Sequence, residues 1–452
     1  MSDTIAAIAT GAQVAAIGIV RLSGPESVAL AERLFRPFSG GPMSRQADRK
    51  LVFGELTGRD GQLLDVCLCT VSRSPNSYTG EDTAEFQCHG SPVVLRSLLE
   101  ELFALGARQA GPGEFTKRAF LNGRMELCAA EAVVDIIDAE TVEAARNAAG
   151  QLSGAMGERI GRVYEALTEI SSHYHAVLDY PDEDIEEFRL AAYRDTVTAA
   201  RADLAALLKS FERGKLLTGG IPTAIVGRPN AGKSSLLNAL LGYDRAIVTD
   251  IPGTTRDTIE EKLRLGGLLL RLIDTAGIRE TEDPVERLGV ERSRTALENA
   301  SLVIAVVDGS EELTAEDEAV LRAAEGAERA LAVLSKRDLD VRTERLPTTL
   351  PVIPVSVITG EGLDRLEEAV KALFPMPQVP AGEILTNARQ AEAVSRALES
   401  VDAALEAMEA GMTPDIVLTE TETAMSALGE LTGRTVREDV TNRIFQRFCV
   451  GK

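Results

Sequence analysis

Residues 227–234 read Gly227-Arg228-Pro229-Asn230-Ala231-Gly232-Lys233-Ser234, which matches the phosphate-binding pattern G-x-x-x-x-G-K-[ST]. An apolar stretch at 223–226 precedes the pattern, and four leucines at helical spacing follow it. Glycines let backbone N–H groups approach phosphate oxygens, while the lysine supplies a cation and the serine a hydroxyl for Mg²⁺. This strand, loop and helix predict a nucleotide site whose contacts come from Asn230, Ala231, Gly232, Lys233, Ser234 and Ser235.

The chain around this loop alternates apolar strands with amphipathic helical segments. The expected strands lie at 223–226, 268–273, 302–307, 331–334 and 352–355. Such alternation is typical of a mostly parallel sheet with helices on both faces. We therefore predict an α/β domain with a mostly parallel sheet over residues 214–374.

Helical patterns rich in Ala, Leu and Glu lie on both sides of that domain, at residues 118–213 and 375–452. The first pattern contains helices up to about residue 180 and from about 188 to 211, and the second is interrupted at 411–414. Neither segment would bury its apolar stripe well alone. We predict one discontinuous helical domain into which the α/β domain is inserted.

Residues 1–117 predict a separate N-terminal mixed α/β domain. Short apolar runs at 17–22, 51–56 and 66–71 are separated by Gly, Pro, Ser and Asn, and a helical pattern occupies 93–105. These features are typical of short strands joined by turns.

Composition limits the classes of function. The 452 residues include 48 Lys and Arg against 70 Asp and Glu, a formal net charge of −22, which argues against a large phosphate-binding surface and hence against a directly held nucleic acid. Five cysteines without a C-x-x-C pair, and three histidines, argue against a disulfide framework or a structural zinc site. The absence of a basic leader and of a long apolar run indicates a cytoplasmic protein without a membrane segment.

Two further segments complete the expected triphosphate site. Asp274-Thr275-Ala276-Gly277 follows an apolar strand, as expected for a carboxylate that holds Mg²⁺ through water and a glycine N–H near the γ-phosphate. Between this segment and the phosphate loop, Thr254-Thr255 offers a hydroxyl to the same ion.

The base contact is expected at Ser335-Lys336-Arg337-Asp338, at the end of the strand 331–334. An aspartate can accept hydrogen bonds from N1–H and the exocyclic amine of guanine, a pair that adenine does not offer. The order and spacing of these elements resemble the translation-factor-related GTPases, and the resemblance covers residues 214–374. It implies a Ras-like P-loop GTPase domain. Ser335 replaces the usual Asn and Ser356-Val357-Ile358 replaces a Ser-Ala-Lys-like segment, so selectivity for GTP depends mainly on Asp338, with Lys336 over the base.

The whole chain resembles the MnmE (TrmE) tRNA-modification GTPases. The resemblance rests on Asn230 and on the segments Thr249-Asp250-Ile251-Pro252-Gly253-Thr254-Thr255-Arg256-Asp257, Asn76-Ser77-Tyr78-Thr79-Gly80-Glu81-Asp82, Gly111-Pro112-Gly113-Glu114-Phe115-Thr116-Lys117-Arg118-Ala119-Phe120-Leu121-Asn122 and Phe448-Cys449-Val450-Gly451-Lys452. A phosphate loop is common to many proteins, but its combination with the Cys-aliphatic-Gly-Lys terminus is highly specific.

The resemblance implies a homodimer whose residues 1–117 bind 5-formyl- or methylene-tetrahydrofolate and dimerise. It also implies a heterotetramer with a FAD-dependent MnmG-like partner that adds an aminomethyl or carboxymethylaminomethyl group at C5 of the wobble uridine of certain tRNAs. The implied folate contacts are Arg21, Glu81, Arg124 and Lys452. The family often has Lys at position 124. Without the family, Arg21 and Arg124 would read as solvated surface residues.

The resemblance also implies activation of hydrolysis by potassium in place of an arginine finger. The implied K⁺ ligands are the Asn230 side chain and oxygens of Thr249, Ile251 and Thr254, while Ser234 and Thr255 bind Mg²⁺. The family's catalytic carboxylate corresponds to Glu286, which sequence alone would interpret as a first-turn helix glutamate. Cys449 is either a reactive thiol near the folate or a small residue that docks the tail, and Cys67 and Cys69 are expected in a core.

Two other classes of function remain as alternatives. One is a GTPase switch in ribosome assembly that transfers no carbon, which the N-terminal motifs and the Cys449–Lys452 tail argue against. The other is a nucleotide-binding scaffold without turnover, which would lack part of the set Lys233, Ser234, Thr255 and Asp274. The excess acidity lies mainly outside residues 1–117, so most tRNA phosphate contacts are expected on the partner.

Overall fold

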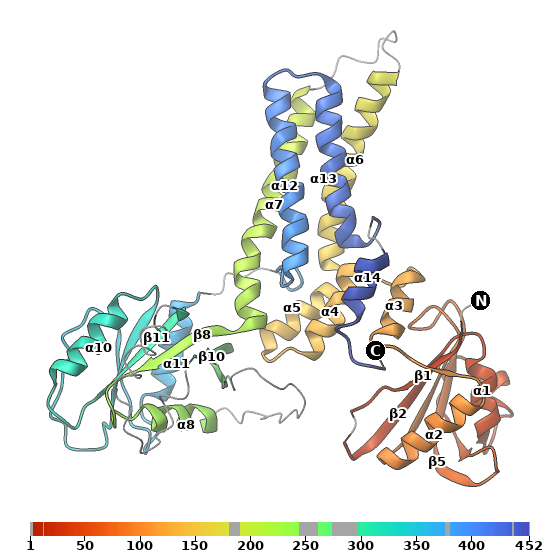
Figure 1. The fold of residues 1–452 in the computed structure, drawn as a ribbon, viewed down its shortest axis with the longest axis horizontal. Helices are drawn as coiled ribbons and strands as arrows, with labels where there is room; N and C mark the ends of the chain where they lie inside the picture. The colour runs from red at the N-terminus through yellow and green to blue at the C-terminus, as the bar shows by residue number, and fades with distance from the viewer. Residues whose placement is uncertain are drawn as a thin grey trace. The chain divides into compact units, whose positions relative to one another are not determined.

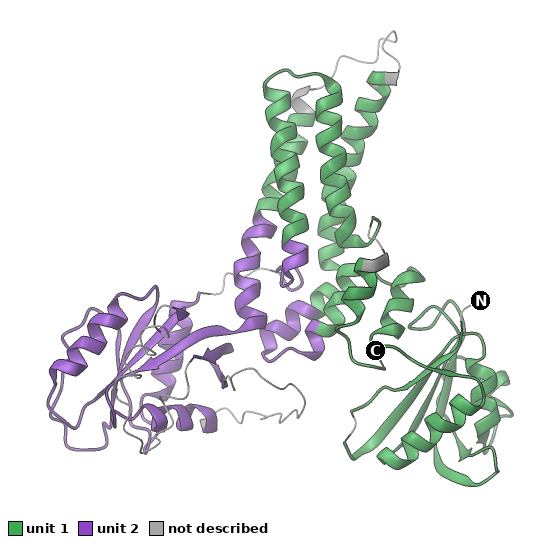
Figure 2. Ribbon diagram, in the orientation of Figure 1, with its two compact units in different colours: residues 1–134, 149–205, 392–452 green, residues 135–148, 206–391 purple. Residues whose placement is uncertain are grey.

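The computed structural model describes residues 3–11, 13–179, 190–243, 261–273, 297, 299–375, 380–435 and 438–451. The chain forms two compact units, which Figure 2 distinguishes by colour. Unit 1 consists of residues 1–134, 149–205 and 392–452, and unit 2 of residues 135–148 and 206–391. Each unit is therefore assembled from segments that are distant in the sequence.

A seven-stranded sheet forms the N-terminal part of unit 1, in the order β3-β4-β5-β6-β2-β1-β7. Neighbouring strands are antiparallel except β1 and β7, which are parallel. The strands are β1 (Ile5–Ile8), β2 (Ala15–Ser23), β3 (Phe35–Pro37), β4 (Val52–Thr57), β5 (Leu63–Ser72), β6 (Thr83–Gly90) and β7 (Arg108–Gln109). The three expected strands are present as β2, β4 and β5.

Both faces of this sheet carry helices. On one face, α1 (Ser27–Leu34) and α2 (Pro92–Ala104) bury their leucines against alternate residues of the central strands, and a 3₁₀ turn, η1 (Met43–Arg45), packs beside α1. On the other face, Phe115 of α3 (Glu114–Leu121) packs with Ile5 and Ala7 of β1. Because side chains alternate along a strand, this second face is also the face of Arg21, which pairs with Ala7 in the β1–β2 ladder.

The other large part of unit 1 consists of α6 (Ala155–Asp179), α13 (Pro414–Thr432), residues 190–205 of α7 (Leu190–Gly219) and residues 392–409 of α12 (Ala388–Glu409). They lie side by side in Figure 1. Neighbouring helices are joined by the ion pairs Arg159–Asp203, Arg201–Asp402 and Arg396–Glu430 and by a hydrogen bond between His175 and Glu422. Segments before and after the α/β domain thus share one bundle, which confirms the predicted discontinuous helical domain.

The C-terminal helix α14 (Glu438–Phe445) packs on α4 (Leu127–Ile137). Leu127, Ala130 and Val133 form a small core with Phe445 and Phe448. This core brings the end of the chain next to the N-terminal domain of unit 1.

Unit 2 contains a six-stranded sheet in the order β13-β12-β11-β8-β10-β9. All neighbours are parallel except β9 and β10. The strands are β8 (Ile221–Val226), β9 (Lys262–Leu265), β10 (Leu268–Leu272), β11 (Leu302–Asp308), β12 (Ala330–Ser335) and β13 (Val352–Pro354). The five predicted strands are confirmed, and the hairpin strand β9 is an additional one.

Helices cover both faces of this sheet, as predicted. One face packs against α8 (Lys233–Tyr243) and α11 (Leu363–Leu373), and the other against α10 (Ala315–Glu325). β11 is buried along its whole length, which is expected of a central parallel strand between two helical layers. α5 (Val142–Leu152) precedes the bundle helices in the chain.

Helix α7 is longer than the sequence pattern predicts, because it continues past residue 211 to Gly219. Leu217 is buried, so packing extends the helix through Gly214 despite the cost of glycine in a helix. The turn that ends it is made by Gly220, whose φ of 72° favours glycine. None of the described helices combines the length and apolar character needed to cross a bilayer.

Candidate functional site

The phosphate loop connects β8 to α8 at the carboxyl edge of the sheet. Asn230 and Gly232 adopt left-handed backbone conformations, with φ values of 59° and 98°. A Cβ at Gly227 would lie 2.4 Å from the carbonyl oxygen of Val306, so only glycine fits between the loop and β11. These constraints shape the loop so that α8 begins at Lys233 with its N–H groups at the expected phosphate position.

The two cations of the loop have different partners. The Lys233 Nζ donates to the carbonyl oxygens of Gly227 and Arg228, at 2.9 and 2.8 Å, within its own loop. The Arg228 guanidinium instead lies 2.5 Å from Glu311 and 3.2 Å from the buried Asp317. The hydrogen bond to Glu311 raises the pKa of Arg228. Arg228 therefore ties the loop to α10, and Lys233 is the cation that reaches along the loop.

Ser335 connects the base segment to the phosphate loop. Its buried hydroxyl lies 2.6 Å from the carbonyl oxygen of Ala231 and 3.1 Å from that of Val307. A hydroxyl has one hydrogen to donate, and the shorter contact identifies Ala231 as its principal acceptor. The residue that departs from the usual Asn thus still joins the two nucleotide segments.

Lys336 follows with a φ of 57° and pairs with Asp308 at the end of β11, at 2.7 Å. Burial would raise the pKa of Asp308, but hydrogen bonds from Lys336 and Ser310 outweigh it, and the pKa lies below its ordinary value. The ion pair holds Lys336 at the end of β11, two residues before the exposed Asp338.

Asp338 is oriented by the segment 356–358. The Ser356 hydroxyl donates to Asp338 Oδ1 at 2.7 Å and accepts the Thr359 N–H at 3.2 Å. Ser356 is buried, whereas Ile358 is 83% exposed. The structure therefore brings the two predicted base segments together at one carboxylate.

Several predicted residues lie outside the described part of the chain. They are Thr249, Asp250, Ile251, Pro252, Gly253, Thr254, Thr255, Asp274, Thr275, Ala276, Gly277, Glu286 and Lys452.

A second group of predicted residues converges on the loop between β5 and β6, at residues 76–82 in unit 1. Arg21 lies below this loop: its guanidinium is 5.6 Å from the ring centroid of Tyr78 and 5.7 Å from that of Phe115. It also donates to Glu85 on the neighbouring strand at 2.7 Å. Arg21 is therefore a partly buried, oriented cation and not a solvated one.

Glu81 is held by two hydrogen bonds to the same oxygen. Its Oε2 accepts from the Ser23 hydroxyl and from Arg118 Nη1, each at 2.8 Å. Arg118, whose side chain is 11% exposed, also bonds Asp3 at 2.7 Å and Glu114 at 3.0 Å. These contacts raise the pKa of Arg118 against the effect of burial. Arg118 thus links the loop to α3 and to the N-terminal segment.

Arg124 borders the same loop, and the C-terminal tail docks on residues near β1. A Cβ at Gly80 would lie 3.3 Å from Cγ of Arg124, so the arginine stem passes over that glycine. In the tail, Val450 forms a β-bridge with Pro112, and the Gly113 N–H donates to the carbonyl oxygen of Cys449. A Cβ at Gly451 would meet the Ile8 carbonyl oxygen at 2.3 Å. The tail therefore docks against β1, the strand next to Arg21.

The cysteines divide into two groups. Cys67 and Cys69 are buried in the sheet core, as predicted, and Cys88 and Cys128 are also buried. Cys449 is exposed at the docked tail, which leaves both interpretations of this residue open.

Sequence reasoning missed the residues that support the predicted ones, chiefly Ser23, Arg118, Asp308 and the partner role of Ser356. Arg118 lies in the quoted segment 111–122, four residues after Glu114, and this helical spacing was the available signal. The others meet their partners only through the fold, because strand pairing or adjacent loops bring distant segments together.

Comparisons with known proteins agree over the full chain. Family models described as the GTP-binding protein TrmE N-terminus and the MnmE helical domain match residues 4–124 and 127–449. Proteins named tRNA modification GTPase MnmE are similar to it, with 44% identity in Symbiobacterium thermophilum, 40% in Alkaliphilus oremlandii and 42% in Listeria innocua. The alignments cover 100% of this chain and 99%, 100% and 99% of those proteins.

Among solved structures, Aquifex aeolicus Era bound to GDP.AlF4- aligns with 39% of this chain and 65% of that chain, with 26% identity and a TM-score of 0.26. This similarity is too low to carry an argument. The full-length relatives and the two family models decide the assignment: the chain belongs to the MnmE family of tRNA modification GTPases.

Proposed function

We propose that the protein is a GTP hydrolase that acts in tRNA modification, with Mg²⁺ and K⁺ at the nucleotide and a folate one-carbon unit bound in the N-terminal domain. The observation that carries this proposal is the convergence of Arg21, Glu81 and Arg124 on one loop, in the same chain as a phosphate loop of nucleotide-binding geometry. A GTPase that acts only as a switch does not require the group formed by Arg21, Glu81 and Arg124.

The described residues of the loop 227–234 fit a nucleotide. The left-handed Asn230 and Gly232 shape the backbone of the loop, and Gly227 lets it pack closely against β11. Ser234 would hold Mg²⁺ and Lys233 would bind the β- and γ-phosphates, with Asp274, Thr255 and Glu286 as the family's remaining positions. Mg²⁺ supplies charge neutralisation between the phosphates, and this chain's residues orient them.

Asn230 supports the potassium part of the proposal. Its side chain is exposed at the top of the loop, where an amide oxygen can contribute to a cage of oxygen ligands. K⁺ would supply the positive charge that an arginine finger supplies elsewhere. Thr249, Ile251 and Thr254 complete the proposed ligand set.

We expect GTP hydrolysis to be several-fold faster in K⁺ than in Na⁺, because the larger ion matches this cage and places charge at the phosphates. Asn230→Gly keeps the left-handed backbone but removes the amide oxygen, so it should abolish the difference between the two salts. Asn230→Asp keeps an oxygen and serves as the control. Steady-state hydrolysis at equal ionic strength measures the effect, and equal wild-type rates in both salts would contradict the assignment.

The loop 76–82 fits a folate chemically. Arg21 and Arg124 provide cations for the carboxylates of the glutamate tail, and Glu81 provides an oriented carboxylate for pterin N–H groups. The folate supplies the one-carbon unit. The chain's residues bind and orient it, and Lys452 and Cys449 belong to the proposed site through the docked tail.

The assembly is also part of the proposal: a homodimer in the cytoplasm that works with a FAD-dependent MnmG-like partner to add a carboxymethylaminomethyl or aminomethyl group at C5 of the wobble uridine. The net charge of −22 supports most tRNA phosphate contacts lying on the partner.

Nucleoside mass spectrometry of tRNA from cells lacking the protein tests the function. We expect the wobble-uridine modification to disappear and to return with the wild type, but not with Lys233→Ala or Glu81→Gln. Glu55→Gln is the matched control, because Glu55 lies in the same sheet and pairs only with the exposed Arg36 among the ion pairs described. An unchanged wobble-uridine profile in the deletion strain would favour a ribosome-assembly switch.

A further inference from the structure

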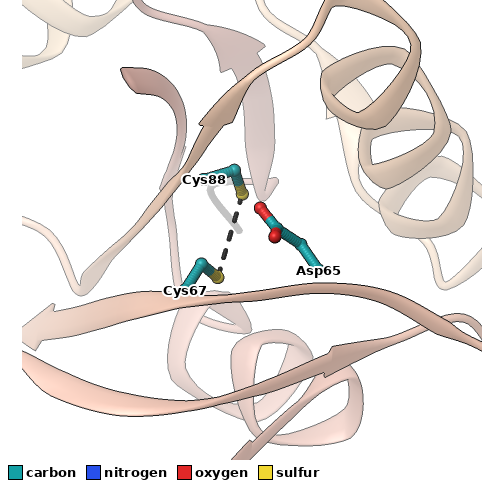
Figure 3. A group of neighbouring side chains, drawn as sticks. All are labelled: Asp65, Cys67 and Cys88. Carbon is teal, nitrogen blue, oxygen red and sulfur yellow. Dashed lines mark hydrogen bonds between the residues drawn. The ribbon is translucent and has the colours of Figure 1, made fainter. Parts of the chain in front are cut away.

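Two buried cysteines face each other at one end of the β5–β6 hairpin. Continuing the register of Leu68 with Gln87 places Cys67 opposite Cys88. Their Sγ atoms are 4.0 Å apart, with Cys88 as the donor, and both side chains are at most 5% exposed. Figure 3 shows the pair together with Asp65, which lies two residues before Cys67 on the same strand.

The Asp65 carboxylate is directed toward the two sulfurs. One ligand atom from each of the three residues lies within 4.8 Å of the others, and Figure 3 shows the carboxylate turned toward Cys88. The Asp65 side chain is 10% exposed. Two thiols and a carboxylate therefore lie close together at the border of the core.

Hydrogen bonds from Val66 and His89 hold the Asp65 carboxylate in this orientation. Asp65 Oδ1 accepts from the Val66 N–H at 2.7 Å and lies 2.8 Å from His89 Nδ1, while Oδ2 accepts the His89 N–H at 2.8 Å. Metal-binding carboxylates are commonly oriented by such outer hydrogen bonds. The His89 ring is 76% exposed, so the outer end of this hydrogen-bond network faces solvent.

We propose that Asp65, Cys67 and Cys88 bind one zinc ion, with water as the fourth ligand and His89 as a positioning residue for Asp65. In a tetrahedral site with Zn–S bonds of about 2.3 Å, the sulfurs lie ~3.8 Å apart, close to the observed 4.0 Å. Two thiolates and a carboxylate suit zinc better than hard ions such as Mg²⁺ or Ca²⁺. No sequence spacing indicates this site, because strand pairing alone joins the two cysteines.

Zinc binds cysteine as the thiolate, so binding at Cys67 and Cys88 releases the protons of the two thiols. Zinc affinity should therefore fall as pH decreases. The site lies at the end of the hairpin opposite the loop 76–82, so its role is to stabilise the hairpin that carries Glu81.

The test uses the full-length protein, reduced and metal-free, with Cys449→Ser as background so that this exposed thiol contributes no signal. Titration with Co²⁺ alone is expected to give thiolate charge-transfer bands in the near ultraviolet and strong tetrahedral d–d bands, at one ion per chain. Titration with Zn²⁺ should remove the bands and raise the melting temperature as its free concentration rises.

Cys67→Ser and Cys88→Ser should each weaken the charge-transfer bands and the zinc-dependent melting shift. Cys69→Ser, a buried cysteine two residues away on β5, is the matched control and should retain both. His89→Gln should lower zinc affinity by about tenfold and leave the bands in place. Absence of charge-transfer bands, or their equal loss in Cys69→Ser, would overturn the proposal.

Discussion

Asp338→Asn should change the base preference of the nucleotide site from guanine to xanthine. The aspartate is expected to accept hydrogen bonds from N1–H and the 2-amino group of guanine. An asparagine instead offers one acceptor and one donor, which match N1–H and the 2-oxo group of xanthine. Sites built on paired hydrogen bonds reject a mismatched ligand strongly, so we expect GTP affinity to fall by at least about a hundredfold.

The described contacts make this exchange specific. The Ser356 hydroxyl accepts from the Thr359 N–H and is therefore oriented to donate to the Oδ1 position of residue 338. In Asp338→Asn, the amide oxygen should take the Oδ1 position, which leaves the amide nitrogen at the Oδ2 position. Asp338→Asn combined with Ser356→Ala frees the amide to flip and should give a weaker preference for xanthine.

Competition of GTP and XTP against a fluorescent nucleotide measures the change, with Asp340→Asn as the control. Asp340 is an exposed aspartate of the same segment. Retained selectivity for GTP in Asp338→Asn would show that another group contacts the guanine.

The parallel sheet could be predicted from sequence because its signals are local. The run 302–307 is apolar at every position, and it forms the fully buried β11. The phosphate loop is equally local: its glycines and lysine lie within eight residues, and the backbone conformation that they require is encoded beside the strand and helix that they connect.

What could not be predicted depends on contacts between distant segments. Gly214 lies inside α7 because the chain at Leu385 passes so closely that a Cβ would meet its carbonyl oxygen at 1.7 Å. Ser335 suggested a weakened base site, yet its hydroxyl bonds Ala231, 104 residues away. The support of Glu81 by Arg118 spans 37 residues. Periodicity contains no information about such pairs.

The charge network around Arg118 makes a pH-dependent contribution to the stability of the N-terminal domain. Burial acts to raise the pKa of Glu114, but bonds from Arg108, the Gly111 N–H and Arg118 lower it from 4.5 to about 2. Asp3 bonds Arg108 and, more weakly, Arg118, and these contacts lower its pKa from 3.8 to about 2. Since both folded-state values are depressed, the stabilisation is fully present above about pH 4.5 and is lost as pH falls toward 2.

Arg118→Met should remove the charged partner of Glu81 and weaken this network. Breaking a buried charge pair by removing one partner lowers the free energy of unfolding by about 3–5 kcal/mol. Because the side chains of this network are 11–18% exposed, we expect the lower end of that range, about 3 kcal/mol, at pH 7. The loss should shrink between pH 4.5 and 2. Urea unfolding at several pH values measures this loss of stability. Arg36→Met is the control: it breaks a pair whose arginine side chain is 78% exposed, so it should lower the free energy of unfolding by less than ~1 kcal/mol.

The same variant tests the proposed folate site, since Arg118 acts there through Glu81. We expect the affinity for 5-formyl-tetrahydrofolate to fall at least about tenfold, the equivalent of one lost charged hydrogen bond. Ser23→Ala removes the other bond to Glu81 Oε2 without removing a charge, so it should lower folate affinity with little change in the pH dependence of unfolding. If Arg118→Met lowered the stability but left the folate affinity unchanged, the orientation of the Glu81 carboxylate would not contribute to folate binding.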